Sequence, residues 1–189
     1  MLIRKCIDKQ FIMVRFIRKI LTLLSETKYL ILLSALFIVF VFLFKSDYSF
    51  SSKHIEKISN NGLLDTQFSY NIETVKKYFT SYGEIGRADY TKFQVLDMLF
   101  PIVYSLLLAS LLFRLFAKSK YNPYLFAIFA AIFDYIENIF LFVINNTFPD
   151  FNPNLVYISS FSTSLKWSFI LISLIIVLVG GVNLFIKKR

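Results

Sequence analysis

Two carboxylates and a carboxamide lie in the middle of a long apolar stretch, in the segment FDYIENIFL at residues 133–141. A charged aspartate at the centre of a membrane span costs about 2.5–3.5 kcal/mol on the insertion scale, so such residues usually have a role. Asp134, Glu137 and Asn138 are spaced by three and four residues, which places them on one face of a helix. A buried acid can protonate a bound molecule while a neighbouring carboxylate accepts a proton, so this face predicts ligand binding or acid–base chemistry.

The elements that must hold this face are four apolar runs, over residues 29–44, 93–113, 121–144 and 167–186. The first and last runs carry no charged residue, the second carries only Asp97, and the third carries Asp134 and Glu137. A transmembrane helix needs about 20 mostly apolar residues, and Lys28 and Lys45 can snorkel at the ends of the shorter first run. The sequence therefore predicts an all-α integral membrane protein, a bundle of four transmembrane helices.

Two further segments flank these runs and complete the predicted organisation. Residues 1–28 predict a basic amphipathic helix that lies in the membrane interface, and residues 29–189 form the membrane domain. Within that domain, residues 45–92 predict an extracytoplasmic segment that begins as a polar loop. A short helix starts after Asn71, a plausible N-cap, and Gly83 can end it. Residues 83–97 then read as a tight connection into the second span.

Lysine and arginine counts orient the predicted bundle. Seven basic residues lie in 1–28, three in 114–120 and three at the C-terminus, but none in 145–163. Both termini are therefore predicted to be cytoplasmic in a multi-pass membrane protein, either plasma membrane or bacterial inner membrane. The net charge of +9 follows mostly from this bias, and no nucleic-acid motif accompanies it. We expect no nucleic-acid partner.

Placing the polar residues by depth predicts a pocket in the outer half of the bundle. Asp97 lies in the outer quarter of the second span, and Tyr104 lies two turns deeper on the same face. Pro101 between them lacks an N–H and predicts a kink or a free carbonyl. Lys166 begins the fourth span and Arg87 precedes the second. We expect Asp134 and Glu137 as the acids and Asn138 as an orienting amide, with ligand-contacting partners Asp97, Tyr104, Arg87 and Lys166.

The predicted function is binding of a small amphipathic or lipid-like ligand, with acid–base catalysis on it left open. A structural interpretation stays beside it, in which the acids pair with Lys166 or Arg87 to hold helices together. A non-catalytic accessory subunit, alone as a dimer or with another membrane protein, is the alternative function. A proton-coupled transporter is less favoured, because the inner half of the bundle is apolar. One cysteine, Cys6, and one histidine, His54, predict no metal site or cofactor.

Overall fold

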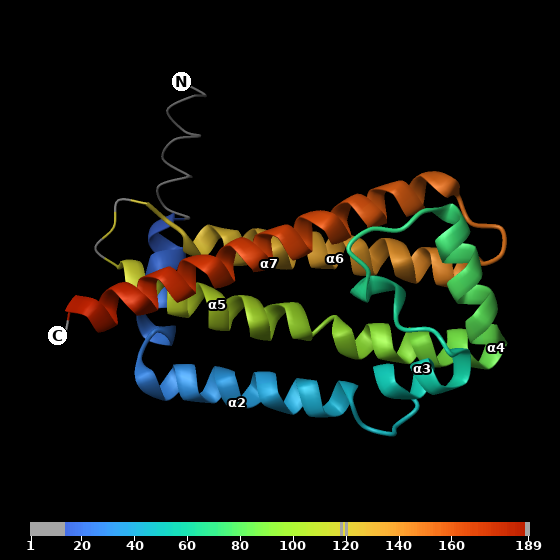
Figure 1. Cartoon of the computed structure of the whole chain (residues 1–189), viewed down its shortest axis with the longest axis horizontal. Coiled ribbons are helices and arrows are strands. Elements are labelled where there is room, and N and C mark those ends of the chain that lie inside the picture. The colour runs from blue at the N-terminus through green and yellow to red at the C-terminus, as the bar shows by residue number, and fades with distance from the viewer. Residues whose placement is uncertain (1–13, 118, 120, 188–189) are drawn as a thin grey trace.

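The computed structural model describes residues 14–117, 119 and 121–187, and this part of the chain contains helices and no strand. A helix over 14–24 comes first. The labelled elements that follow in chain order are α2 (Thr27–Phe44), α3 (Ser52–Ser59), the 3-10 helix η1 (Leu64–Thr66), α4 (Ile72–Asp97), α5 (Phe100–Phe116), α6 (Tyr124–Thr147) and α7 (Pro153–Lys187) (Figure 1).

Four helical segments of the described chain are long and apolar enough to cross a membrane. They are Thr27–Phe44, Ile72–Phe116, Tyr124–Thr147 and Pro153–Leu184. This confirms an all-helical chain with four helices able to span a bilayer, as expected of a multi-pass membrane protein.

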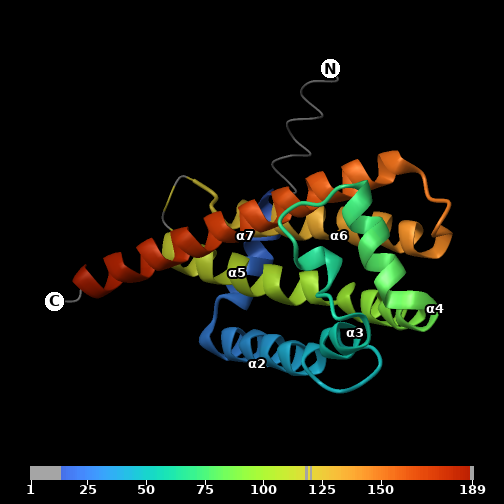
Figure 2. The ribbon, with the colours of Figure 1, turned by 45° about the vertical axis from the view of Figure 1, so that its right-hand side comes forward.

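The bundle is organised around α5. Helices α6 and α7 form the most extensive pair, and α5 packs against both of them and against α2. Helix α2 has no other substantial partner among the described helices, and it stands apart from α6 and α7 in both views (Figures 1 and 2). The helix over 14–24 and the end of α7 lie at one end of the bundle. We call the opposite end, where α3, η1 and the α6–α7 connection lie, the distal end.

Aromatic rings attach α2 to the bundle. Phe37, Phe40 and Phe44 surround Phe100 at the start of α5, with ring centroids 5.2–5.8 Å apart. Such ring contacts add about 0.5–1.5 kcal/mol each to the area that they bury. The other faces of α2 are exposed in the isolated chain, which suits a helix surrounded by lipid.

The second predicted span is broken near its distal end. Helix α4 ends at Asp97 and α5 begins at Phe100, with Pro101 in its first turn, where a missing N–H is tolerated. The hydroxyl of Tyr135 donates to the carbonyl oxygen of Met98 at 2.7 Å, so a carbonyl in the break is hydrogen-bonded from α6. The interruption expected from Pro101 is therefore present, and it aims Asp97 at α6.

Helix α4 starts where the sequence predicts, because the Asn71 side chain accepts the N–H of Thr74 at 2.8 Å. Its first part ends at Gly83, as expected. Gly83 adopts φ 64° and ψ −174°, a conformation reserved for glycine, and the chain turns there and resumes a helix that runs to Asp97. The tight connection expected over 83–97 is confined to the turn at Gly83, and the rest of this segment is helical, with Tyr90 and Phe93 buried on one face.

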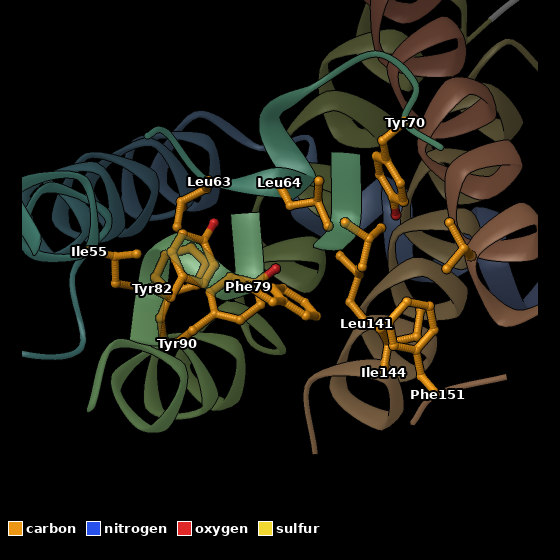
Figure 3. Packing of buried hydrophobic residues seen from close by; sticks show 13 residues of the cluster. Ile55, Leu63, Leu64, Tyr70, Phe79, Tyr82, Tyr90, Leu141, Ile144 and Phe151 are labelled. Carbon is orange, nitrogen blue, oxygen red and sulfur yellow. The ribbon is translucent and has the colours of Figure 1, made fainter. Parts of the chain in front are cut away.

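The distal end has a hydrophobic core that the predicted polar loop did not suggest. Ser51 caps α3 by accepting the N–H of His54, and Ile55 of α3 is fully buried. Side chains from α3, η1, α4 and α6 meet there, as Figure 3 shows. Its labelled members are Ile55, Leu63, Leu64, Tyr70, Phe79, Tyr82, Tyr90, Leu141, Ile144 and Phe151. This core holds residues 51–97 as a cap over the bundle.

The helix over 14–24 is the described part of the predicted amphipathic segment, whose residues 1–13 lie outside the described chain. Leu21 is buried against Leu112, Phe113 and Tyr124. Arg18 donates to the Asn122 side chain at 3.1 Å. This part of the segment is thus docked onto α5 and the start of α6, at the end opposite the distal end.

Candidate functional site

The third predicted span places its polar residues as expected, on one buried face of α6. Asp134, Glu137 and Asn138 are each at most 5% exposed, and all three point into the bundle. Helix α6 packs against α5 on one side and α7 on the other, so its polar face meets Tyr104 from α5 and Lys166 from α7. The spacing of the polar residues along α6 is therefore enough to bring α5, α6 and α7 together at one site.

Lys166 is the cation of this site. Its ammonium lies 2.5 Å from Oε2 of Glu137 and 3.6 Å from Oδ1 of Asp134. Its nitrogen also lies 3.4 Å from the backbone oxygen of Asp65 in η1. The Lys166 side chain is only 7% exposed. Because a buried charge is tolerated only when it is paired, these contacts explain how α7 carries a lysine here.

Tyr104 and Asn138 hold the two aspartates. The Tyr104 hydroxyl donates to Oδ2 of Asp134 at 2.9 Å. The Asn138 amide donates to Oδ2 of Asp97 at 2.9 Å and lies 3.4 Å from Oδ1 of Asp134. Asn138 thus bridges an aspartate of α4 and an aspartate of its own helix.

Glu137 lies deeper than the other acids. It is fully buried, and besides Lys166 it accepts a hydrogen bond from the Thr163 hydroxyl at 2.7 Å. The Tyr70 hydroxyl and Ser159 Oγ, 2.6 Å apart, extend this polar contact toward the cap. Glu137 does not line the cavity described below, whereas Lys166 does. In this arrangement Glu137 sets the charge environment of Lys166.

Asp65 joins the site from outside the spans. It lies in η1, is 8% exposed, and its Oδ1 has no hydrogen-bond partner among the described residues. Burial raises the pKa of the Asp65 carboxyl above its ordinary value, while the ammonium of Lys166 acts in the opposite direction. Three backbone groups hold this stretch along α7: Asp65 O faces Lys166, Phe68 O accepts from Ser164, and Tyr70 N–H donates to Ser160.

A cavity of about 720 Å³ opens beside this cluster. Asp65, Asp97, Asp134 and Lys166 line its polar part, with Tyr104 between them and the apolar part. Apolar walls come from α2, α5 and α7: Phe37, Val41, Phe44, Phe100, Leu107, Leu108, Leu111, Trp167, Ile170 and Leu174. The exposed Lys45 at the end of α2 and Ser52 of α3 line the cavity as well. Exposed residues of the cap, among them Glu56 and Thr66, also line it, so the cavity reaches the distal surface. Its volume is typical of a small-molecule site.

Arg87 is the one predicted site residue that the structure does not bring to the cluster. Its guanidinium donates to the carbonyl oxygen of Phe79 at 3.1 Å and lies 4.9 Å from the centre of the Phe148 ring. The hydrogen bond to Phe79 joins the two parts of α4 across the Gly83 kink, and the ring contact joins α4 to the end of α6. Arg87 lies on the cap side of α4, two helical turns and more before Asp97.

No family model, curated protein or solved structure matches this chain. Function is therefore inferred from the geometry of the cavity and its cluster. Within the described part of the chain no three His, Cys, Asp or Glu side chains gather in a way that could hold a metal ion. The chemistry available is that of carboxyl groups, one ammonium, a phenol and an amide.

The sequence interpretation missed Asp65, Tyr70, Ser159 and Thr163. Ser159, Thr163 and Lys166 are spaced by four and three residues, so helical periodicity over 153–166 would have placed them on one face with Lys166. Asp65 carries no such signal. An acid in a polar loop is ordinary, and only the folding of residues 45–71 over the bundle brings it to the cavity.

Proposed function

We propose that this protein binds a small amphipathic or lipid-like molecule in the cavity, with the polar part of the molecule at the acids Asp65, Asp97 and Asp134 and its apolar part along α5. The observation that carries the proposal is the division of one cavity into an acidic, hydrogen-bonded part and an apolar part. A lipid-like molecule matches both parts, whereas a polar metabolite would leave the leucine and phenylalanine walls unmatched.

Helix packing supports access from the membrane as well. Helices α2 and α7 both pack on α5 and both line the cavity, but no substantial contact joins α2 to α7 among the described residues. An apolar chain can therefore reach the cavity between these two helices without leaving hydrocarbon. The polar rim formed by Glu56 and Thr66 then lies near the membrane surface.

Acid–base chemistry on the bound molecule is the catalytic form of this proposal. Asp134 lines the cavity and is held by Tyr104, and Lys166 beside it can stabilise negative charge. Glu137, behind Lys166, would keep that lysine charged. If the protein is such an enzyme, the Asp134→Asn variant should lose turnover but still bind the ligand. An accessory subunit tolerates the same substitution and co-purifies with a partner.

Trp167 allows the binding proposal to be tested directly, because it is the only tryptophan of the sequence and lines the cavity. Single-chain lipids brominated along the alkyl chain should quench its fluorescence saturably in detergent micelles. Leu107→Phe together with Leu111→Phe fills the apolar part and should weaken quenching. Leu178→Phe is the matched control, because Leu178 is 68% exposed and does not line the cavity. Equal quenching in both variants would contradict the proposal.

We also propose that both ends of the chain face the cytoplasm and that the distal end faces outward, in line with the basic residues in the segments opposite the distal end. In a Cys6→Ser background, a cysteine introduced at Asp150 should react with an impermeant maleimide in intact cells. A cysteine at Lys19 should react only after permeabilisation. Both positions are exposed. The opposite labelling pattern would reverse the orientation.

A further inference from the structure

We propose that the polar part of the bound molecule is cationic, a protonated amine held between Asp65 and Asp97. This inference rests on the proposed function and names the ligand class of the same cavity. It follows from the charge balance of the cluster, from the partners already taken by Lys166, and from the aromatic walls beside the acids.

The buried charges do not balance. Four carboxyl groups and one ammonium meet at this site, and every one of these residues is at most 8% exposed: Asp65, Asp97, Asp134, Glu137 and Lys166. A buried carboxyl group either stays protonated or takes a cation as its partner, so a molecule that brings positive charge can pair there, whereas an anionic molecule cannot.

Lys166 does not pair with Asp65 or Asp97, the two acids of the site that belong to the cap. Its ammonium is directed to Glu137 and Asp134, and its other contacts are the Trp167 ring and the backbone oxygen of Asp65 rather than the Asp65 carboxylate. Asp97 has the neutral amide of Asn138 as its hydrogen-bond donor. Asp65 Oδ1 has no donor in the described chain, although it is buried and Asp65 lines the cavity. Two carboxyl groups on the cavity wall are thus left for a ligand.

The walls beside these acids suit an ammonium group. Phe93, Phe100 and Tyr104 line the same cavity as Asp65 and Asp97, and so does Trp167, whose ring centre lies 5.2 Å from the Lys166 ammonium. Aromatic faces attract cations within about 6 Å of the ring centre, most strongly where water is excluded. Carboxylates together with aromatic faces therefore favour a protonated amine over an alcohol, and they disfavour a carboxylate or phosphate.

The apolar part limits the size of the molecule. From Tyr104 to Leu111 the wall of α5 extends for seven residues, about 10 Å at 1.5 Å per residue. Leu107, Leu108, Ile170 and Leu174 line this stretch from α5 and α7. A single alkyl chain of medium length fits such a wall, and decylamine is a suitable probe.

The test compares decylamine, decanol and decanoate at neutral pH, where an alkylamine is protonated, with Trp167 fluorescence of the full chain in a non-ionic detergent. Decylamine should bind roughly tenfold or more tightly than decanol, because hydrogen bonds to charged groups are the stronger ones. Decanoate should bind most weakly. Asp65→Asn, and separately Asp97→Asn, should remove most of the preference for the amine. Asp150→Asn, an exposed aspartate at the distal end, should retain it.

The outcomes separate this inference from the proposed function. If all three probes bind alike and Leu107→Phe with Leu111→Phe weakens them, the cavity binds amphiphiles but the cation preference is refuted. If the preference persists in both aspartate variants, the assignment to Asp65 and Asp97 is refuted. If no probe changes Trp167 fluorescence saturably, the proposed function itself fails.

Discussion

The ammonium of Lys166 lies 2.5 Å from the carboxylate of Glu137, and both side chains are removed from solvent. Their helices are the most closely packed pair of the bundle. A buried ion pair of this kind seldom stabilises a fold more than apolar side chains of the same volume would. Its retention therefore fits a site that needs a fixed charge, with Glu137 holding a lysine that also contacts Asp134.

Lys166→Met should destabilise the protein by about 3–5 kcal/mol, because it leaves the Glu137 carboxylate buried without a cation. Thermal unfolding in detergent measures the effect. Lys53→Met is the control, since Lys53 pairs with Asp47 on the surface, where such pairs contribute about 0–1 kcal/mol. Adding Glu137→Leu to Lys166→Met should restore much of the lost stability. Equal melting temperatures for Lys166→Met and Lys53→Met would show that the pair is not buried as described.

Asn138→Leu should also lower stability, by about 1–3 kcal/mol for each buried carboxylate that loses its donor. Asp97 loses its hydrogen bond entirely, whereas Asp134 keeps the one from Tyr104. Asn146→Leu is the matched control, because it is the same substitution in the same helix. Asn146 is exposed, and its side chain donates only to the carbonyl of Phe142, four residues earlier in α6. The stability of the two variants is compared by unfolding them under the same conditions. A larger loss of stability in Asn146→Leu than in Asn138→Leu would contradict the bridging role of Asn138.

Asp65→Asn should become more stable relative to the unchanged protein as the pH rises from about 4 toward neutrality. Burial raises the folded-state pKa of Asp65. The Asp65 carboxyl therefore makes its full contribution to stability only below about pH 3.9, the pKa of an aspartate in the unfolded chain. That contribution is lost as the pH rises through the pKa of Asp65 in the folded state. Asparagine does not ionise. Each kcal/mol of difference should shift the melting temperature by about 2–4 °C.

Melting curves without ligand, recorded across this pH range, check the prediction. Asp150→Asn, the same substitution at an exposed position, reports what the change of side chain does by itself. A difference between Asp65→Asn and the unchanged protein that stays constant with pH would mean that the carboxyl is not desolvated.

Gly83→Ala should cost about 1–3 kcal/mol of stability, because a residue with a Cβ is strained at φ 64° and ψ −174°. Space is not the cause, since a Cβ at Gly83 would meet no atom within 4 Å. Gly181→Ala tests this point, because Gly181 also has open space around its Cβ but lies within α7. That substitution should be neutral or slightly stabilising by helix propensity. A similar effect of both substitutions on the melting temperature would argue against the kink.

The sequence by itself determined the four spanning helices and the polar face of α6. Both follow from local properties: the length of an apolar run sets a span, and helical periodicity places Asp134, Glu137 and Asn138 on one face. The cost of burying charge then directs that face into the bundle, where Tyr104 and Lys166 meet it. The break at Asp97–Phe100 was likewise readable from Pro101.

Tertiary structure alone decided the rest. Whether Arg87 reaches the cluster depends on how α4 turns at Gly83, and the turn carries it to Phe148 instead. Asp65 reaches the cavity only because a hydrophobic core folds residues 45–71 over the bundle and α7 hydrogen-bonds that stretch. Such contacts join residues about 100 positions apart, and their geometry depends on the packing of side chains from several helices at once. No local pattern in the sequence specifies that packing.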